Sequence, residues 1–100
     1  MPRRDSAGWV DLLVRPRTNA PDGVLVVAEK PLRDAITELS RTNGYEAFAP
    51  ATPLDAIQIL ERRRSQIGHA FISSVVDWGR ELRTLLAEEY PSIGRIILAA

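Results

Sequence analysis

The sequence predicts an α/β fold, a doubly wound parallel sheet with three helices, over residues 23–100. Short apolar runs alternate with segments of helical periodicity through this whole range. The first apolar run, 24–27, is aliphatic throughout, which is typical of a parallel strand covered on both faces. Residues 1–22 are expected to form an N-terminal extension in front of this domain, and its apolar run 9–14 is a candidate extra strand.

A first helix is expected over 31–42, because its apolar residues recur at helical spacing and Pro31 suits the first turn. The pair Asn43-Gly44 predicts a left-handed stop. A short second strand is expected to follow over 45–49 and to lie at an edge of the sheet.

A second helix is expected to begin with Thr52 as its N-cap and to end near the arginines at 62–64. A third strand over 69–73, a third helix over 80–89 and a fourth strand over 95–98 complete the prediction. The expected inner residues of the second and third helices are Ala56, Ile57, Leu60, Leu82, Leu85 and Leu86.

Composition narrows the classes of function. Thirteen basic and thirteen acidic residues cancel, which argues against a general electrostatic attraction to nucleic acid or anionic membrane. No cysteine is present, so disulfides, thiolate catalysis and cysteine metal sites are excluded. No apolar run approaches membrane-spanning length, and no apolar signal segment follows the N-terminal arginines. We expect a soluble cytoplasmic domain without membrane or direct nucleic-acid partners.

Four phrases point to a known family by their order and spacing: GVLVV at 23–27, NGYEA at 43–47, Ala56-Ile57 with Leu60, and EEYP at 88–91 followed by IILAA at 96–100. With these phrases, residues 23–100 resemble the first four strands and three helices of a response-regulator receiver domain. The resemblance implies a flavodoxin-like sheet in the order 2-1-3-4-5, here truncated after the fourth strand, with the site at the carboxyl ends of the strands.

Receivers transfer a phosphoryl group to an aspartate with the help of a divalent cation, so the resemblance implies a site rich in carboxylates. Here the acid pair after the first strand falls on Ala28 and Glu29. The accepting aspartate falls on Ser74, or on Ser73 if the register shifts by one, and the hydroxyl residue ending the fourth strand falls on Ala99. The fifth strand and its lysine have no counterpart. We therefore expect a degenerate site with no catalysis, metal or cofactor.

Other chemistry at these positions is not expected. Ser74 and His69 are five residues apart along one strand. A strand rises roughly 3.3 Å per residue, so the two residues lie more than about 15 Å apart, which is too far for a nucleophile and its base to form a hydrogen bond. His69 is expected to open the strand near solvent. Glu29 and Asp77 offer two carboxylates but no third ligand for a cation.

A sheet that ends at its fourth strand would present an aliphatic edge to solvent, and such edges favour association. The expected interface residues are Trp9, Trp78, Ile96, Ile97 and Leu98, since tryptophan is enriched at binding hot spots. Three arrangements would cover this edge: the strand 9–14 folds back over or beside it, two copies pair through it, or the chain belongs to a longer protein. Of these we expect a homodimer through the fourth-strand region.

The function expected from these observations is that of a non-catalytic pseudo-receiver. It would act as a protein–protein interaction and dimerisation module in bacterial signal transduction, unregulated by aspartyl phosphorylation, with an unidentified signalling protein as a further partner. The alternative is the regulatory N-terminal part of a DNA-binding transcriptional response regulator. A third interpretation is a small phosphotransfer enzyme or phosphate acceptor that uses Glu29 and Ser74.

Overall fold

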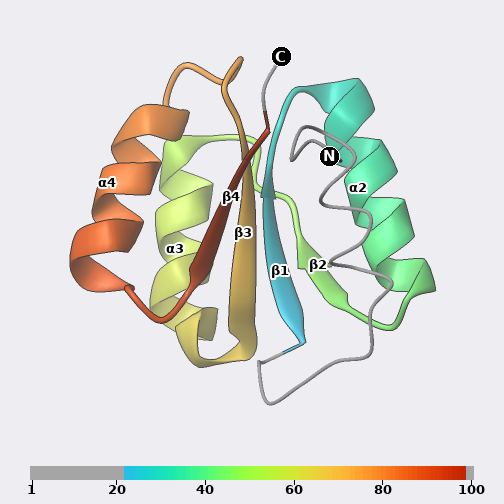
Figure 1. Cartoon of the computed structure of the whole chain (residues 1–100), viewed down its shortest axis with the longest axis horizontal. Helices are drawn as coiled ribbons and strands as arrows, with labels where there is room; N and C mark the ends of the chain where they lie inside the picture. Colours follow the sequence, from blue (N-terminus) through green and yellow to red (C-terminus); the bar gives the residue numbers. More distant parts are fainter. Residues whose placement is uncertain (1–21, 99–100) are drawn as a thin grey trace, which may run out of the picture.

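A computed structural model describes residues 22–98, in which strands and helices alternate along the chain. The elements are β1 (Gly23–Val27), α2 (Lys30–Thr42), β2 (Glu46–Phe48), α3 (Pro53–Arg63), the 3₁₀ turn η1 (Arg64–Gln66), β3 (Ile67–Ser73), α4 (Gly79–Glu89) and β4 (Gly94–Leu98). All neighbouring strands pair in parallel, in the order β2-β1-β3-β4 (Figure 1). The predicted α/β fold with a doubly wound, flavodoxin-like parallel sheet and three helices is confirmed. The candidate strand 9–14, Trp9 and Ala99 lie outside the described residues.

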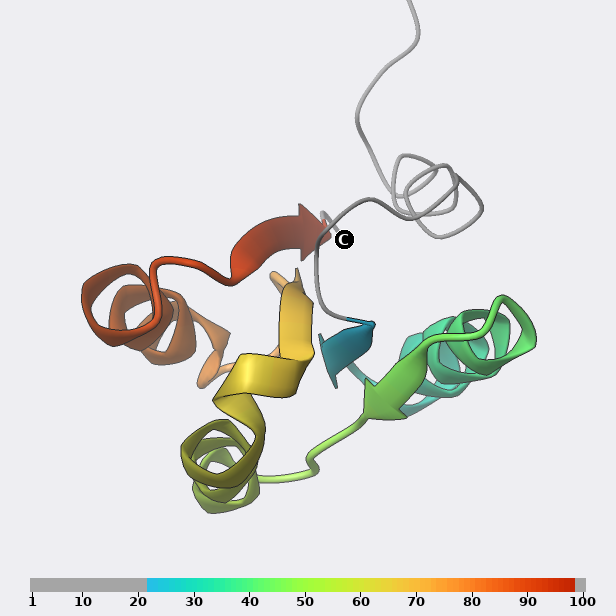
Figure 2. The same cartoon turned by 90° about the horizontal axis from the view of Figure 1, so that it is seen from below.

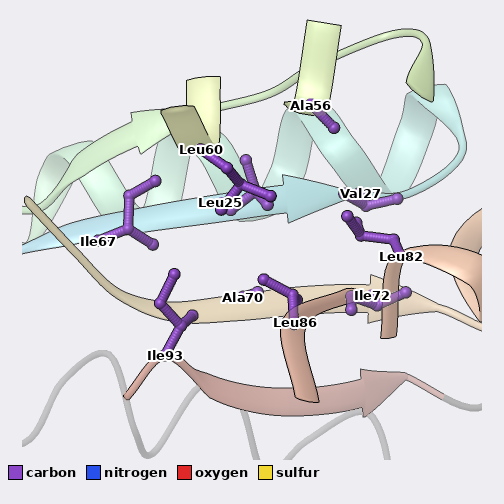
Figure 3. Close-up of a cluster of buried hydrophobic side chains, with 10 residues drawn as sticks. All are labelled: Leu25, Val27, Ala56, Leu60, Ile67, Ala70, Ile72, Leu82, Leu86 and Ile93. Atoms are coloured by element: carbon purple, nitrogen blue, oxygen red, sulfur yellow. The ribbon is translucent and has the colours of Figure 1, made fainter. Parts of the chain in front are cut away.

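The helices cover both faces of the sheet. Figure 2 shows α2 on one face, and α3 and α4 together on the opposite face. Each face has its own apolar cluster. The cluster under α3 and α4 contains Leu25, Val27, Ala56, Leu60, Ile67, Ala70, Ile72, Leu82, Leu86 and Ile93 (Figure 3). The cluster on the side of α2 contains Val24, Val26, Ile36, Phe71 and Leu98.

The central strand β1 is buried along its whole length, as its aliphatic sequence predicts. Its first residue, Gly23, allows the starts of β1 and β3 to approach closely. A Cβ at Gly23 would lie only 2.2 Å from the carbonyl oxygen of Gln66, which belongs to the backbone and cannot move aside. Pairing is irregular here: Gly23 is opposite Ile67, whereas the next residue is opposite His69.

Two helix ends follow the local chemistry of the sequence. Gly44 has a φ of 84°, the left-handed conformation predicted for the stop after α2. Thr52 caps α3, because its side-chain oxygen accepts a hydrogen bond from the backbone N–H of Asp55 at 3.2 Å. Both expectations are confirmed.

The boundaries of the other elements differ modestly from prediction. Strand β3 begins at Ile67, two residues earlier than expected, because Ile67 is 2% exposed and pairs with β1. Strand β2 is shorter than predicted and spans Glu46–Phe48. Within residues 22–98, none of the helices combines the length and the apolar character that a membrane span requires.

Candidate functional site

The carboxyl end of β1 carries one acidic side chain. Ala28 directly follows the strand and is 5% exposed. Glu29 is the N-cap of α2, and its carbonyl oxygen accepts a hydrogen bond from the N–H of Arg33 at 2.8 Å. Its carboxylate atom Oε1 is buried, and no described residue donates a hydrogen bond to it. A single carboxylate therefore stands where the resemblance implies an acid pair.

The carboxyl end of β3 carries two serines that take part in the turn after the strand. Ser73 is the last strand residue and is 2% exposed, and its Oγ accepts a hydrogen bond from the N–H of Val75 at 3.2 Å. Ser74 is exposed, and its backbone N–H donates to the carbonyl oxygen of Leu98 at 2.9 Å. The two residues thus shape the turn and join it to β4, and neither supplies the carboxylate that an acyl phosphate requires.

His69 lies at the other end of β3. It is half-buried and faces Gly94 of β4, where an added Cβ would lie 2.8 Å from the Cδ2 atom of its ring. Burial lowers the pKa of His69 from its ordinary value of 6.5, so the ring is neutral at pH 7. The expectation that His69 opens the strand is wrong, because β3 begins two residues earlier. Four residues, about 13 Å of strand, separate His69 from Ser73, so the ring is no base for that serine.

Metal ligands are also sparse. Among the described residues, no group of three or more histidine, aspartate or glutamate side chains lies close enough to hold a metal ion. Glu29 follows β1 and Asp77 follows β3, so both lie at the carboxyl edge of the sheet, where ligands of open α/β sheets usually bind.

Strand β4 presents its aliphatic residues differently from the prediction. Leu98 is 1% exposed and belongs to the cluster on the side of α2, against which Ile96 also packs. Ile97 points to the other face and is 39% exposed. Leu98 is therefore a core residue and not an interface residue, and Ile97 is the one expected interface position of β4 with a large accessible side chain.

A polar hollow of about 330 Å³ lies beside Ile97 at the carboxyl edge. Ser73 and Ser74 line it together with Arg80 and Arg83 from α4. Val75, in the adjoining turn, is 49% exposed. Val75 and Ile97 are thus exposed apolar side chains near the carboxyl edge of the described sheet, and Ile97 borders a hollow that charged residues also line.

A second hollow, of about 450 Å³, separates α3 from α4. It is lined by Pro53, Ile57, Asp77, Trp78, Glu81, Leu82 and Leu85. We call it the α3–α4 groove. Ile57 was expected among the inner residues of its helix, yet it is 39% exposed and forms one wall of this groove. Trp78, one of the expected interface residues, is partly buried against the core and lines this groove.

Comparison of the chain with protein-family models, with curated proteins and with solved structures finds no match. The features of the molecule that bear on its function are therefore the fold, the residues at the carboxyl edge of the sheet, and the two surfaces that carry accessible apolar side chains.

Proposed function

We propose that this chain is a non-catalytic, receiver-like interaction module of bacterial signal transduction that acts in the cytoplasm and is not switched by aspartyl phosphate. The observation that carries the proposal is the set of residues at the carboxyl edge. Ala28, Ser73 and Ser74 stand at the ends of β1 and β3, where the receiver reaction needs carboxylates. Among the described residues, this edge has no acceptor aspartate and no group of three or more metal-binding side chains, which supports a role in binding over a role in phosphotransfer.

The edge strand supports self-association as one form of that binding. β4 is the last strand of the described sheet, and such a strand can pair with the same strand of a second copy. Val75 and Ile97 add exposed apolar area beside it. In a two-fold interface each residue occurs twice, so both side chains would contribute from both copies. We propose a homodimer through the β4 region.

Phosphorylation is tested directly. The chain is incubated with acetyl phosphate and magnesium, and its intact mass is measured. We expect no gain of a phosphoryl group, because no aspartate follows β3 at the acceptor position. A phosphorylated species that Ser74→Ala abolishes would contradict the proposal and favour a phosphate acceptor.

Dimerisation is tested by light scattering coupled to gel filtration at micromolar concentration. We expect twice the chain mass of 11.1 kDa for the natural sequence and the single mass for Ile97→Asp. Loss of a hot-spot contact costs about 2 kcal/mol per copy, and two copies raise the dissociation constant roughly 1000-fold.

Ile57→Asp is the matched control, because Ile57 and Ile97 are both 39% exposed and the substitution is the same. We expect this variant, on α3, to remain a dimer. A monomeric natural chain, or equal effects of both substitutions, would show that β4 is not the dimer interface.

A further inference from the structure

The α3–α4 groove has the form of a docking surface for a helix. Its two walls are helices of 11 residues each, α3 and α4, which lie side by side over the same face of the sheet (Figures 1 and 2). Ile57, Trp78 and Leu85 supply accessible or half-buried apolar surface in its wall. Leu54, three residues before Ile57 on α3, extends this apolar surface and is 63% exposed.

The charges of the groove are of one sign. Asp77 and Glu81 are the charged side chains among the described residues that line it. The arginines of the same helices face other hollows: Arg80 and Arg83 line the polar hollow beside Ile97, which Asp77 and Glu81 also border, and Arg62 and Arg63 line the hollow beside Phe48. Because the whole chain has a net charge of zero, this negative character is local to the groove and is not a property of the entire surface.

We infer that the α3–α4 groove binds an amphipathic helical segment of a partner protein whose apolar stripe is flanked by lysine or arginine. Apolar side chains spaced three and four residues apart would enter between Ile57 and Trp78, as in other helix-in-groove complexes. Basic side chains beside the stripe would approach Asp77 and Glu81. This inference rests on the proposed function, since it names the chemistry of the partner that the interaction module recognises.

The probe is a synthetic peptide of leucine and lysine, roughly 12 residues long to match the two helices at 1.5 Å per residue. Its counterpart carries glutamate in place of every lysine. The chain contains two tryptophans, so Trp9→Phe leaves Trp78 as a fluorophore within the groove. We expect the lysine peptide to shift the Trp78 emission to shorter wavelength with micromolar affinity, and the glutamate peptide to bind at least about tenfold more weakly.

Charge reversal identifies the groove as the site. Glu81→Lys should weaken binding of the lysine peptide by about tenfold. Reversal of both acids, Asp77→Lys with Glu81→Lys, should make the glutamate peptide the better ligand. Glu38→Lys makes the same change of charge on the exposed surface of α2, away from the groove, and should leave both affinities unchanged. Equal binding of both peptides, no change in Trp78 emission, or equal effects of Glu81→Lys and Glu38→Lys would overturn the inference.

The same isoleucine variants separate this inference from the dimer proposal. Ile57→Asp should lose the lysine peptide and remain a dimer, whereas Ile97→Asp should bind the peptide as a monomer. A dimer that does not bind the lysine peptide would refute the groove inference and leave the proposed dimer standing. If Trp78 emission changes on dilution of the protein alone, in step with dissociation, the occupant is a second copy and the inference of a basic partner is wrong.

Discussion

Leu54 and Leu60 are both leucines of α3, but their side chains lie in opposite environments. Leu60 is 0% exposed and packs in the cluster under α3 and α4, whereas Leu54 is 63% exposed. Leu60→Ala removes three carbon atoms, which cost about 2.4 kcal/mol at 0.8 kcal/mol per buried methylene. The cavity that remains raises the expected loss of unfolding free energy to about 3 kcal/mol. Leu54→Ala shortens a mostly exposed side chain and should change stability by no more than about 0.5 kcal/mol.

Urea unfolding followed by far-ultraviolet circular dichroism measures both variants. With an m-value of about 1 kcal/mol per molar urea, Leu60→Ala should lower the unfolding midpoint by about 3 M. The melting temperature should fall by roughly 12–24 °C, at 4–8 °C per kcal/mol for a domain of this size. Equal midpoints for the two variants, or a shift below about 1 M for Leu60→Ala, would show that α3 does not pack on the sheet through Leu60.

Thr52→Ala removes the cap of α3 and should cost about 1 kcal/mol by urea unfolding, whereas Thr52→Ser should restore most of it. Gly94→Ala places a Cβ against the His69 ring and should cost about 1–2 kcal/mol, and a melting curve of Gly94→Ala with His69→Ala should show a loss smaller than the sum of the single losses. Burial lowers the pKa of His69 in the folded state, so the unfolded chain binds more protons between that value and 6.5. The contribution of His69 to stability is therefore complete above pH 6.5 and is lost as the pH falls toward the folded pKa. In His69→Gln, the urea midpoint should change less between about pH 7.5 and 5.5 than it does in the natural chain.

The elements that the sequence predicts well are those governed by local chemistry. Gly44 adopts the left-handed conformation and Thr52 caps its helix because neighbouring residues alone determine these features. The start of β3 could not be predicted in this way. Arg64, Ser65 and Gln66 are polar and fit a turn or a helix end, and only the pairing of Ile67 with the distant Gly23 sets the boundary.

The candidate site also has features that can be predicted from the sequence and features that cannot. The absence of acids at Ala28 and Ser74 can be read from the sequence once the ends of the strands are located. The α3–α4 groove cannot be read from the sequence. Ile57 is adjacent to the buried Ala56, and only the direction in which each side chain leaves the axis of α3 makes one exposed and the other buried. Likewise, the alternation of side chains along β4 separates Ile97 from Leu98, but only the packed structure shows which of the two faces is covered.

The position of β1 between β2 and β3 has a consequence for biosynthesis. Gly23 and its partner Ile67 are 44 positions apart, the difference of their numbers, so β1 leaves the ribosome well before its inner neighbour exists. At about 5–20 residues per second, this interval lasts roughly 2–9 s. Throughout it, an uncharged aliphatic strand remains without the partner that later buries it. Slower growth at low temperature, or a chaperone that shields nascent β1, should therefore raise the yield of folded protein more than changes in the late strand β4.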